Sequence, residues 1–214
     1  MFNITNLLIL ALIAIFVVFR LLFSLGKYED VDEIPSSSQK MKTIEPIEVA
    51  NTEEEVNKQI EMVQKLDSAS QSALEKIIKL DENFTLSSFT KKASNAFEYI
   101  LDLYCKQNLD ELKELTSPEV MSSFEKQINS LKSSKSMIKI VIVSISQATI
   151  SQIKLEGKRA TIKMDFESHQ IEYKTDLEGK ILSGNSSNVF KKNDTWTFSK
   201  ELGSASPNWM LIST

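Results

Sequence analysis

The stretch that decides the fold is residues 159–173, RATIKMDFESHQIEY. Its first half alternates apolar and polar residues up to Glu167, which is typical of an antiparallel strand with one buried face. The apolar members are Ala160, Ile162, Met164 and Phe166. After residues 168–170 the apolar positions move to Ile171 and Tyr173, which have the opposite parity. Because a period-two pattern changes parity only at a bulge or a bend, the sequence predicts a bent sheet, with the change near residues 168–170.

Further strands are expected on both sides of this stretch. Residues 137–150 are rich in β-branched side chains, and residues 156–158 (EGK) read as the turn that follows. Residues 178–180 (EGK) predict a hairpin tip, and residues 188–202 and 209–212 supply the last strands.

Helical patterns precede the strands. Residues 51–80 predict either one amphipathic helix or two helices with a break at residues 67–72. A stronger helix is expected to start at Ser87 or Ser88 and to run to about Tyr104, and a short one to cover residues 110–115. Ser117-Pro118-Glu119 predicts the start of another helix, with a capping serine and a first-turn proline. Helices followed by antiparallel strands predict an α+β domain with helices on one face of a bent sheet.

The N-terminus predicts a transmembrane anchor at residues 4–25, about the 20 residues that a helix needs to cross a bilayer. Its apolar residues include Leu7, Leu8, Ile9, Leu10, Ile13, Ile15, Phe16, Val17, Val18 and Phe19. A cleavable signal peptide is the alternative, but no positive side chain precedes Leu7 and no typical cleavage site follows. Arg20 and Lys27 flank the far end, so we expect the N-terminus outside and the rest of the chain inside.

The segments between anchor and domain differ in pattern. Residues 26–50 combine acidic residues, prolines and serines without periodicity and read as a flexible tether. Residues 51–80 carry an apolar stripe among lysines and glutamates. Such a stripe can bind anionic lipid, or it can pack on its own domain or on another copy. The domain itself is expected at residues 81–214.

Nothing in the sequence favours catalysis or a cofactor. With 25 basic and 29 acidic side chains the formal charge is -4, which argues against a nucleic-acid partner. No glycine-rich nucleotide motif and no metal-ligand cluster is present. His169 and Cys105 are each the only residue of their kind and have no evident sequence partner, and Asp165 and Glu167 read as a solvated strand face. We expect a protein that is not an enzyme and has no cofactor or metal site.

Several short motifs follow one another in an order that resembles a known family. Leu80-Asp81, Asp110-x-Leu112-Lys113 and Ser117-Pro118-Glu119-Val120 are followed near the end by Asp194-x-Trp196-Thr197-Phe198 and Pro207-Asn208-Trp209. The motif residues expected in the core are Phe84, Phe89, Ala93, Phe97, Ile100, Phe124, Trp196, Phe198, Pro207, Asn208 and Trp209. Over residues 75–214 the chain resembles the C-terminal domain of the mitochondrial import translocase subunit Tim-forty-four (Tim44), and more closely its α-proteobacterial TimA-type adaptor relatives. Lys200 departs from the pattern, which has an arginine there.

The resemblance implies a cystatin- or nuclear-transport-factor-two-like fold, in which helices cover the concave side of a bent sheet around an apolar pocket. It also implies binding to anionic phospholipid and to protein partners, such as an Hsp-seventy-class chaperone or a translocase. Together with the orientation of the anchor, it implies a domain in the cytoplasm of a bacterium, at the inner membrane. We expect Trp196, Phe198 and Trp209 to be buried sheet residues.

Two functions outside the adaptor class stay open on the sequence. One is a ribosome-to-membrane anchor like a related mitochondrial ribosomal protein, and the other is a pocket enzyme or small-ligand carrier. The acidic balance argues against the first, because binding to ribosomal RNA requires a basic face.

Overall fold

The computed structural model describes residues 52–204 and 208–214 of the 214-residue chain. The chain divides into two units, residues 1–64 and 65–214. In the first unit the described element is helix α2 (Thr52–Gln64), while the predicted anchor and tether lie outside the described residues. Within the described ranges, every helix is too short or too polar to cross a lipid bilayer.

The second unit begins with α3 (Ser68–Leu80) and α4 (Leu86–Lys106). Asp67 caps α3 by accepting the Ser70 backbone N–H at 2.6 Å, so the segment of residues 51–80 holds two helices rather than one. The N-cap of α4 is Thr85, whose hydroxyl accepts the Ser88 N–H at 3.1 Å. The helix therefore starts slightly before the predicted Ser87 or Ser88.

The chain then turns through Gln107, which adopts a left-handed conformation with φ 56°, into α5 (Leu109–Leu115) and α6 (Pro118–Ser133). Asn108 caps α5. Ser117 caps α6 by accepting the Val120 N–H, with Pro118 in the first turn, which confirms the predicted helix start.

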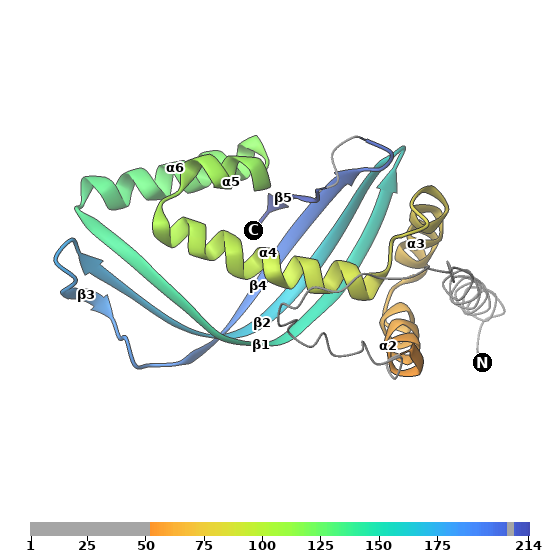
Figure 1. Ribbon diagram of the computed structural model, residues 1–214, viewed down its shortest axis with the longest axis horizontal. Coiled ribbons are helices and arrows are strands. Elements are labelled where there is room, and N and C mark those ends of the chain that lie inside the picture. The colour runs from red at the N-terminus through yellow and green to blue at the C-terminus, as the bar shows by residue number, and fades with distance from the viewer. Residues whose placement is uncertain (1–51, 205–207) are drawn as a thin grey trace, which may run out of the picture. The chain divides into compact units, whose positions relative to one another are not determined.

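The five strands form one antiparallel sheet in the order β1-β2-β4-β5, and β3 pairs with the far end of β2 (Figure 1). The strand bounds are β1 (Ser136–Glu156), β2 (Arg159–Asp176), β3 (Ile181–Gly184), β4 (Phe190–Glu201) and β5 (Met210–Ser213). The two long strands bend together, so that the sheet has a proximal and a distal half (Figure 1). The proximal half comprises residues 147–156 of β1 and 159–167 of β2 with β4 and β5. The distal half comprises residues 136–145 of β1 and 170–176 of β2 with β3.

The structure confirms the predicted bend. The residues without a pairing partner, which form the bulges, lie on β1, whereas the sequence pattern predicted them on β2. The pairing of β1 with β2 skips Val143, Ser146 and Ser151, whereas β2 pairs with β4 without interruption from Arg159 to Gln170. The Ser146 hydroxyl donates to the Glu167 carbonyl at 3.0 Å, and that of Ser151 to the Lys163 carbonyl at 3.4 Å. These bonds satisfy β2 carbonyls beside the bulges, and bulges of this kind bend a strand and increase its twist.

The inner face of β2 keeps its parity as far as Gln170, and the next buried residue of the strand, Thr175, has the opposite parity. Ser168 and Gln170 are fully buried in line with the apolar residues before them, while Ile171 and Tyr173 are half-buried on the outer face. The sequence pattern misled because two polar residues occupy inward positions where apolar ones were expected.

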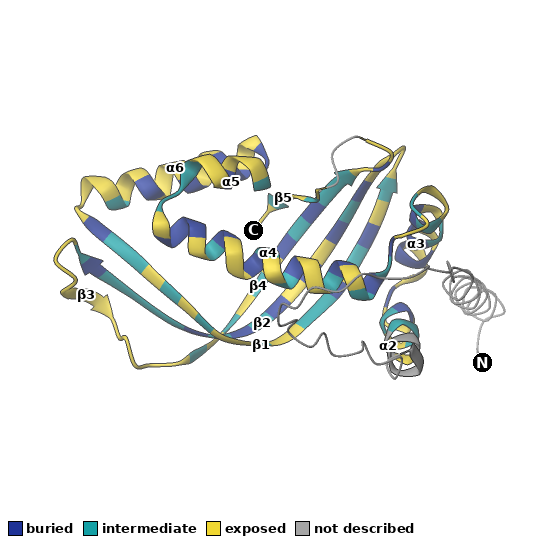
Figure 2. Ribbon diagram, viewed as in Figure 1, coloured by how far each residue is buried: buried dark blue, intermediate teal, exposed yellow. Residues whose placement is uncertain are grey.

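The core lies between α4 and the proximal half (Figure 2). Phe97 on α4 stacks on Phe166 of β2 with ring centroids 4.6 Å apart and contacts Trp196 of β4 at 4.7 Å. Phe89 packs edge-on against Phe198 at 6.1 Å. These contacts confirm the predicted burial of Trp196 and Phe198.

One detail of the predicted core is wrong. Trp209 lies just before β5 and is half-buried, with its ring 4.8 Å from Phe89. Phe124 on α6 packs against Tyr104, at 5.5 Å, on the side of α4 near its C-terminus. The aromatic core is thus two neighbouring clusters along α4 rather than one.

Helix α3 belongs to this unit and covers the outer edge of proximal β1. Its Ala73, Leu74 and Ile77 are buried, and the Ser70 hydroxyl accepts the backbone N–H of Ile153 at 3.0 Å. The end of α3 is also tied to β4, where Lys200 lies 3.7 Å from the Asp81 carboxylate. Of the possibilities left open for the stripe of residues 51–80, packing on the chain's own domain holds for α3.

Candidate functional site

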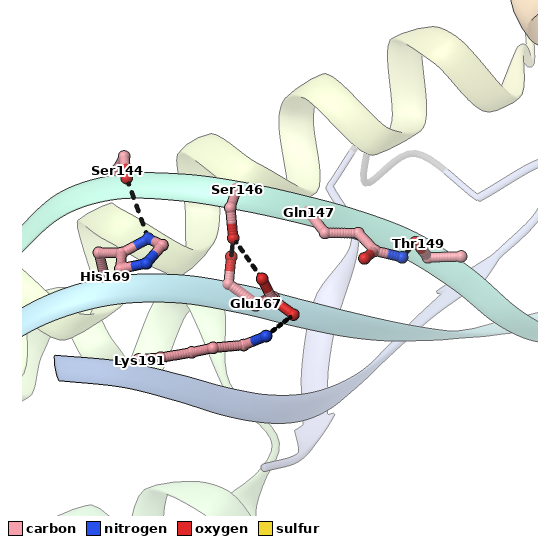
Figure 3. A network of polar contacts seen from close by, with 7 residues as sticks. All are labelled: Ser144, Ser146, Gln147, Thr149, Glu167, His169 and Lys191. Atoms are coloured by element: carbon pink, nitrogen blue, oxygen red, sulfur yellow. Dashed lines mark hydrogen bonds and ion pairs between the residues drawn. The ribbon is translucent and has the colours of Figure 1, made fainter.

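A chain of polar contacts crosses the outer face of the sheet at the bend (Figure 3). The Glu167 carboxylate accepts the Ser146 hydroxyl at 2.9 Å and lies 2.5 Å from the Lys191 ammonium group. Two residues along each strand, the Ser144 hydroxyl lies 3.4 Å from His169 Nδ1. Each contact joins side chains that the cross-strand register places opposite or beside one another.

The hydrogen bonds from Lys191 and Ser146 hold the pKa of Glu167 below its usual range. The carboxylate is therefore a stable anion, and its two oxygens are already engaged. A nucleophile needs a base at about 2.6–3.2 Å that is oriented by a third group. Ser144 and His169 are farther apart than this, and Glu167 is directed to Ser146 and Lys191 (Figure 3). The arrangement suits a structural role: it fastens β1, β2 and β4 where the bulges interrupt the ladder.

The other chemically reactive side chains are also accounted for by structure. Cys105 is buried near the end of α4, and burial raises the pKa of its thiol although the Ile140 N–H opposes the shift. A thiol held in its neutral form is a poor nucleophile and a poor metal ligand. Asp165 accepts the Thr195 hydroxyl at 2.7 Å across the strand pair. Across residues 52–204 and 208–214, no three acidic, histidine or cysteine side chains are grouped to hold a metal ion.

Two buried acceptors near the bend were not foreseen from the sequence. The Gln170 amide donates to the Ser168 hydroxyl at 2.7 Å, but its oxygen has no partner among the described residues. The Oδ2 atom of Asp194 is likewise buried without one, while Oδ1 lies 4.0 Å from Lys192 Nζ. Both atoms can accept a hydrogen bond from water or from a bound molecule. For Gln170, the only sign in the sequence was that residues 168–170 are polar where the strand pattern is otherwise apolar.

The residues predicted from the motifs gather in the proximal half and on the helices that cover it. Eight of the eleven are buried: Phe84, Phe89, Ala93, Phe97, Ile100, Phe124, Trp196 and Phe198. Asn208 is exposed, Trp209 is half-buried, and Pro207 lies outside the described residues, as do the predicted anchor residues. Their common property is packing rather than chemistry.

The Tim44-like domain family matches residues 70–214, which is more than half of the chain. The chain belongs to this family. No curated protein matches it. Among solved structures, the intermembrane space region of the chloroplast protein ARC6 matches with 14% identity and a TM-score of 0.33, covering 56% of this chain and 92% of that one.

The family assignment bears on two contacts described above, that of α3 with β1 and that of Lys200 with Asp81. The matched region of the Tim44-like domain begins inside α3, so the helix that covers the edge of β1 is part of the domain. The Lys200–Asp81 contact links the beginning and the end of the motif series, and lysine supplies the cation that an arginine would.

Proposed function

We propose that this protein is a membrane-tethered adaptor, without catalytic activity, that holds partner proteins at the inner face of an inner membrane. The observation that carries the proposal is the Tim44-like domain over residues 70–214, because domains of this family typically belong to membrane-associated adaptors in protein translocation. The partner is a chaperone of the Hsp-seventy class, a translocase or a translocating polypeptide.

The apolar run at residues 4–25 supports the tether, and Arg20 and Lys27 after it support a cytoplasmic domain. Carbonate washing of membranes should leave the full chain in the pellet, and added protease should reach the domain only after the inner face is opened. Release of the intact chain by alkali would disprove the anchor.

Capture of partners from detergent-solubilised membranes, read by mass spectrometry, tests the adaptor role. The full chain is the bait, and residues 1–50 alone are the control for proteins that associate with the anchor. A chaperone or translocase component enriched only by the full chain is the expected result. No enrichment over the control would contradict the proposal.

The absence of catalysis is tested separately. Ser144 lies too far from His169 to act as a nucleophile with that base, and burial raises the pKa of the Cys105 thiol. We therefore expect His169→Ala and Cys105→Ser to complement a deletion strain as well as the parent does. A null phenotype for either substitution would revive an enzymatic role.

A small-ligand carrier is the second candidate, favoured by the buried oxygen of Gln170 that has no partner among the described residues. A ligand with an N–H or O–H donor would satisfy it. Native mass spectrometry of the protein extracted from membranes separates the two functions. A bound lipid or metabolite without a protein partner would favour the carrier.

A further inference from the structure

The inner face of the sheet carries polar and charged side chains at the bend, next to the aromatic core. Ser168 and Gln170 of β2 are fully buried there. Lys192 and Asp194 of β4 have the parity of that strand's buried residues, so they also lie on the inner face. Glu172 follows on β2, with its carboxylate 3.7 Å from Lys192 Nζ. We call these five residues the bend site.

The curvature of the sheet gathers the charges of the bend site. Asp194 pairs with Phe166, and Glu172 would lie about 20 Å farther along β2 if the strand were flat. In the structure both carboxylates lie near the same ammonium group, Asp194 at 4.0 Å and Glu172 at 3.7 Å from Lys192 Nζ. The concave side of the sheet, which the helices also occupy (Figure 1), therefore brings two anions together across the bend.

The lysine does not satisfy the acceptors of the bend site. Both of its distances exceed the roughly 2.7–2.9 Å of a charge-assisted hydrogen bond. Asp194 Oδ2 and Gln170 Oε1 are buried and have no hydrogen-bond partner among the described residues. The Gln170 amide is directed into the site, because it donates to the Ser168 hydroxyl at 2.7 Å. The site thus offers acceptors for which the chain supplies no donor.

Lys192 also covers the bend site. It lies opposite Ser168 while its ammonium group reaches toward Glu172, so its stem passes over Gln170. Lys192 and Glu172 are each 35% exposed, and a long lysine stem has many rotamers. Rotation of the stem toward solvent would uncover the buried amide. Two carboxylates and one ammonium group give the site a charge of -1 even with the lysine in place.

We propose that the bend site binds a small organic cation through its N–H groups, either a primary ammonium or a guanidinium ion. The inference rests on the second function proposed above, the small-ligand carrier, and names the class of its ligand. Such a cation supplies the donors that Asp194 and Gln170 lack, and its charge opposes that of the site. It differs in kind from the apolar ligand that the pocket implied by the family resemblance would take.

The test titrates the purified full chain, in detergent micelles, with n-butylammonium and with n-butylguanidinium chloride. Binding is followed by calorimetry and by the nuclear magnetic resonance signals of the Gln170 side-chain amide. Tetramethylammonium chloride is the matched probe, because it has the same charge but no N–H donor. We expect at least one of the first two cations to bind and to shift the amide signals, and tetramethylammonium to do neither. Equal binding of all three would refute recognition through N–H groups, and no binding would refute the site.

Charge variants sharpen the result. Asp194→Asn should weaken binding on the order of 10-fold or more, because the cation loses the anion that it contacts. Lys192→Met should strengthen binding, since it removes the competing ammonium group and keeps most of the stem. Asp102→Asn is the control: its carboxylate also pairs with a lysine, at 2.7 Å from Lys106, but on the exposed surface of α4, and binding should not change. Weaker binding after Lys192→Met would contradict the proposal.

Gln170→Leu separates recognition of the ligand from folding. The substitution removes a buried acceptor that has no partner among the described residues, so the melting temperature should stay the same or rise. The affinity for the bound cation should fall. Unchanged affinity with a lower melting temperature would assign Gln170 to structure alone and overturn its role in the site.

The outcomes separate this inference from the proposed functions. Capture of a chaperone or translocase tests the adaptor and does not depend on the bend site. If the protein from membranes carries an apolar lipid, and none of the cations binds, the carrier stands and this class of ligand is wrong. If n-butylammonium binds, but the protein from membranes carries no small molecule, the bend site stands and the carrier function fails.

Discussion

The proximal and distal halves of the sheet are built largely from the same two strands, yet they are stabilised very differently. In the proximal half Phe166, Trp196 and Phe198 are buried under α4, and Ser70 of α3 covers the edge of β1. In the distal half Val141 and Val143 are about half exposed, and the buried strand residues are the polar Ser136, Gln170 and Thr175. Burial along one strand therefore depends on which helices pack against it, and the alternation of apolar and polar residues in the strand does not determine it alone.

The largest expected effect is that of Trp196→Ala. The substitution removes a side chain that is 3% exposed and contacts Phe97 and Phe166, and such truncations cost about 3–5 kcal/mol. This is much of a small domain's stability, so cooperative unfolding in urea, followed by circular dichroism, should be lost. Val141→Ala in the distal half is the control and should change the unfolding free energy by about 0.5 kcal/mol or less. An unchanged midpoint for Trp196→Ala would remove the distinction between the halves.

Next is Ser70→Ala, which tests the cover on the proximal edge. Without the hydroxyl the buried Ile153 N–H loses its acceptor, at a cost of about 1–2 kcal/mol. Amide hydrogen exchange at Ile153 should become faster. Ser94→Ala is the matched control, because that hydroxyl donates only to a carbonyl of its own helix and should matter little. If both substitutions had the same effect, α3 would not be protecting the edge.

Gly184→Ala probes the distal half. Gly184 has φ +80°, and a Cβ there would lie 2.6 Å from the Glu172 carbonyl oxygen. Because β3 has four exposed residues, we expect it to unpair rather than strain the domain, with a loss of global stability below about 1 kcal/mol. Hydrogen exchange should speed up in β3 and stay unchanged in β4. Gly179→Ala, at φ +87° with open space around it, separates backbone strain from the clash. A large global destabilisation by Gly184→Ala would mean that the distal half is as cooperative as the proximal one.

The smallest effect concerns the polar network at the junction of the halves. Lys191 and Ser146 lower the pKa of Glu167, so the stabilisation from this group is present above its unfolded pKa and is lost as pH falls through the folded pKa. Titration of the carboxyl by nuclear magnetic resonance should give a pKa below the ordinary 4.5, and Lys191→Met should raise it. Lys163→Met, on the same strand, is the control and should have less effect. No response to Lys191→Met would show that the ion pair does not persist in solution.

The sequence by itself determined the order of elements and the proximal core. Alternation through Phe166 fixed one buried face, and the caps at Ser117 and Pro118 located α6, because these are local signals. The motif residues Phe97, Trp196 and Phe198 could be assigned to the core, since large aromatic side chains need burial wherever the chain can supply it.

Only the tertiary structure decided where the bend lies and which surfaces stay open. The sequence predicted a bend near residues 168–170, but an extra residue can lie on either strand of a pair, and here Val143, Ser146 and Ser151 all lie on β1. The sequence of β1 from Met137 to Ile145 is mostly apolar on both parities, interrupted by Lys139 and Ser144, as in a strand covered on both faces. The helices reach only one face, because α4 is directed onto the aromatic residues of the proximal half. The exposure of Val141 and Val143 in the distal half is therefore a consequence of packing that no local pattern could reveal.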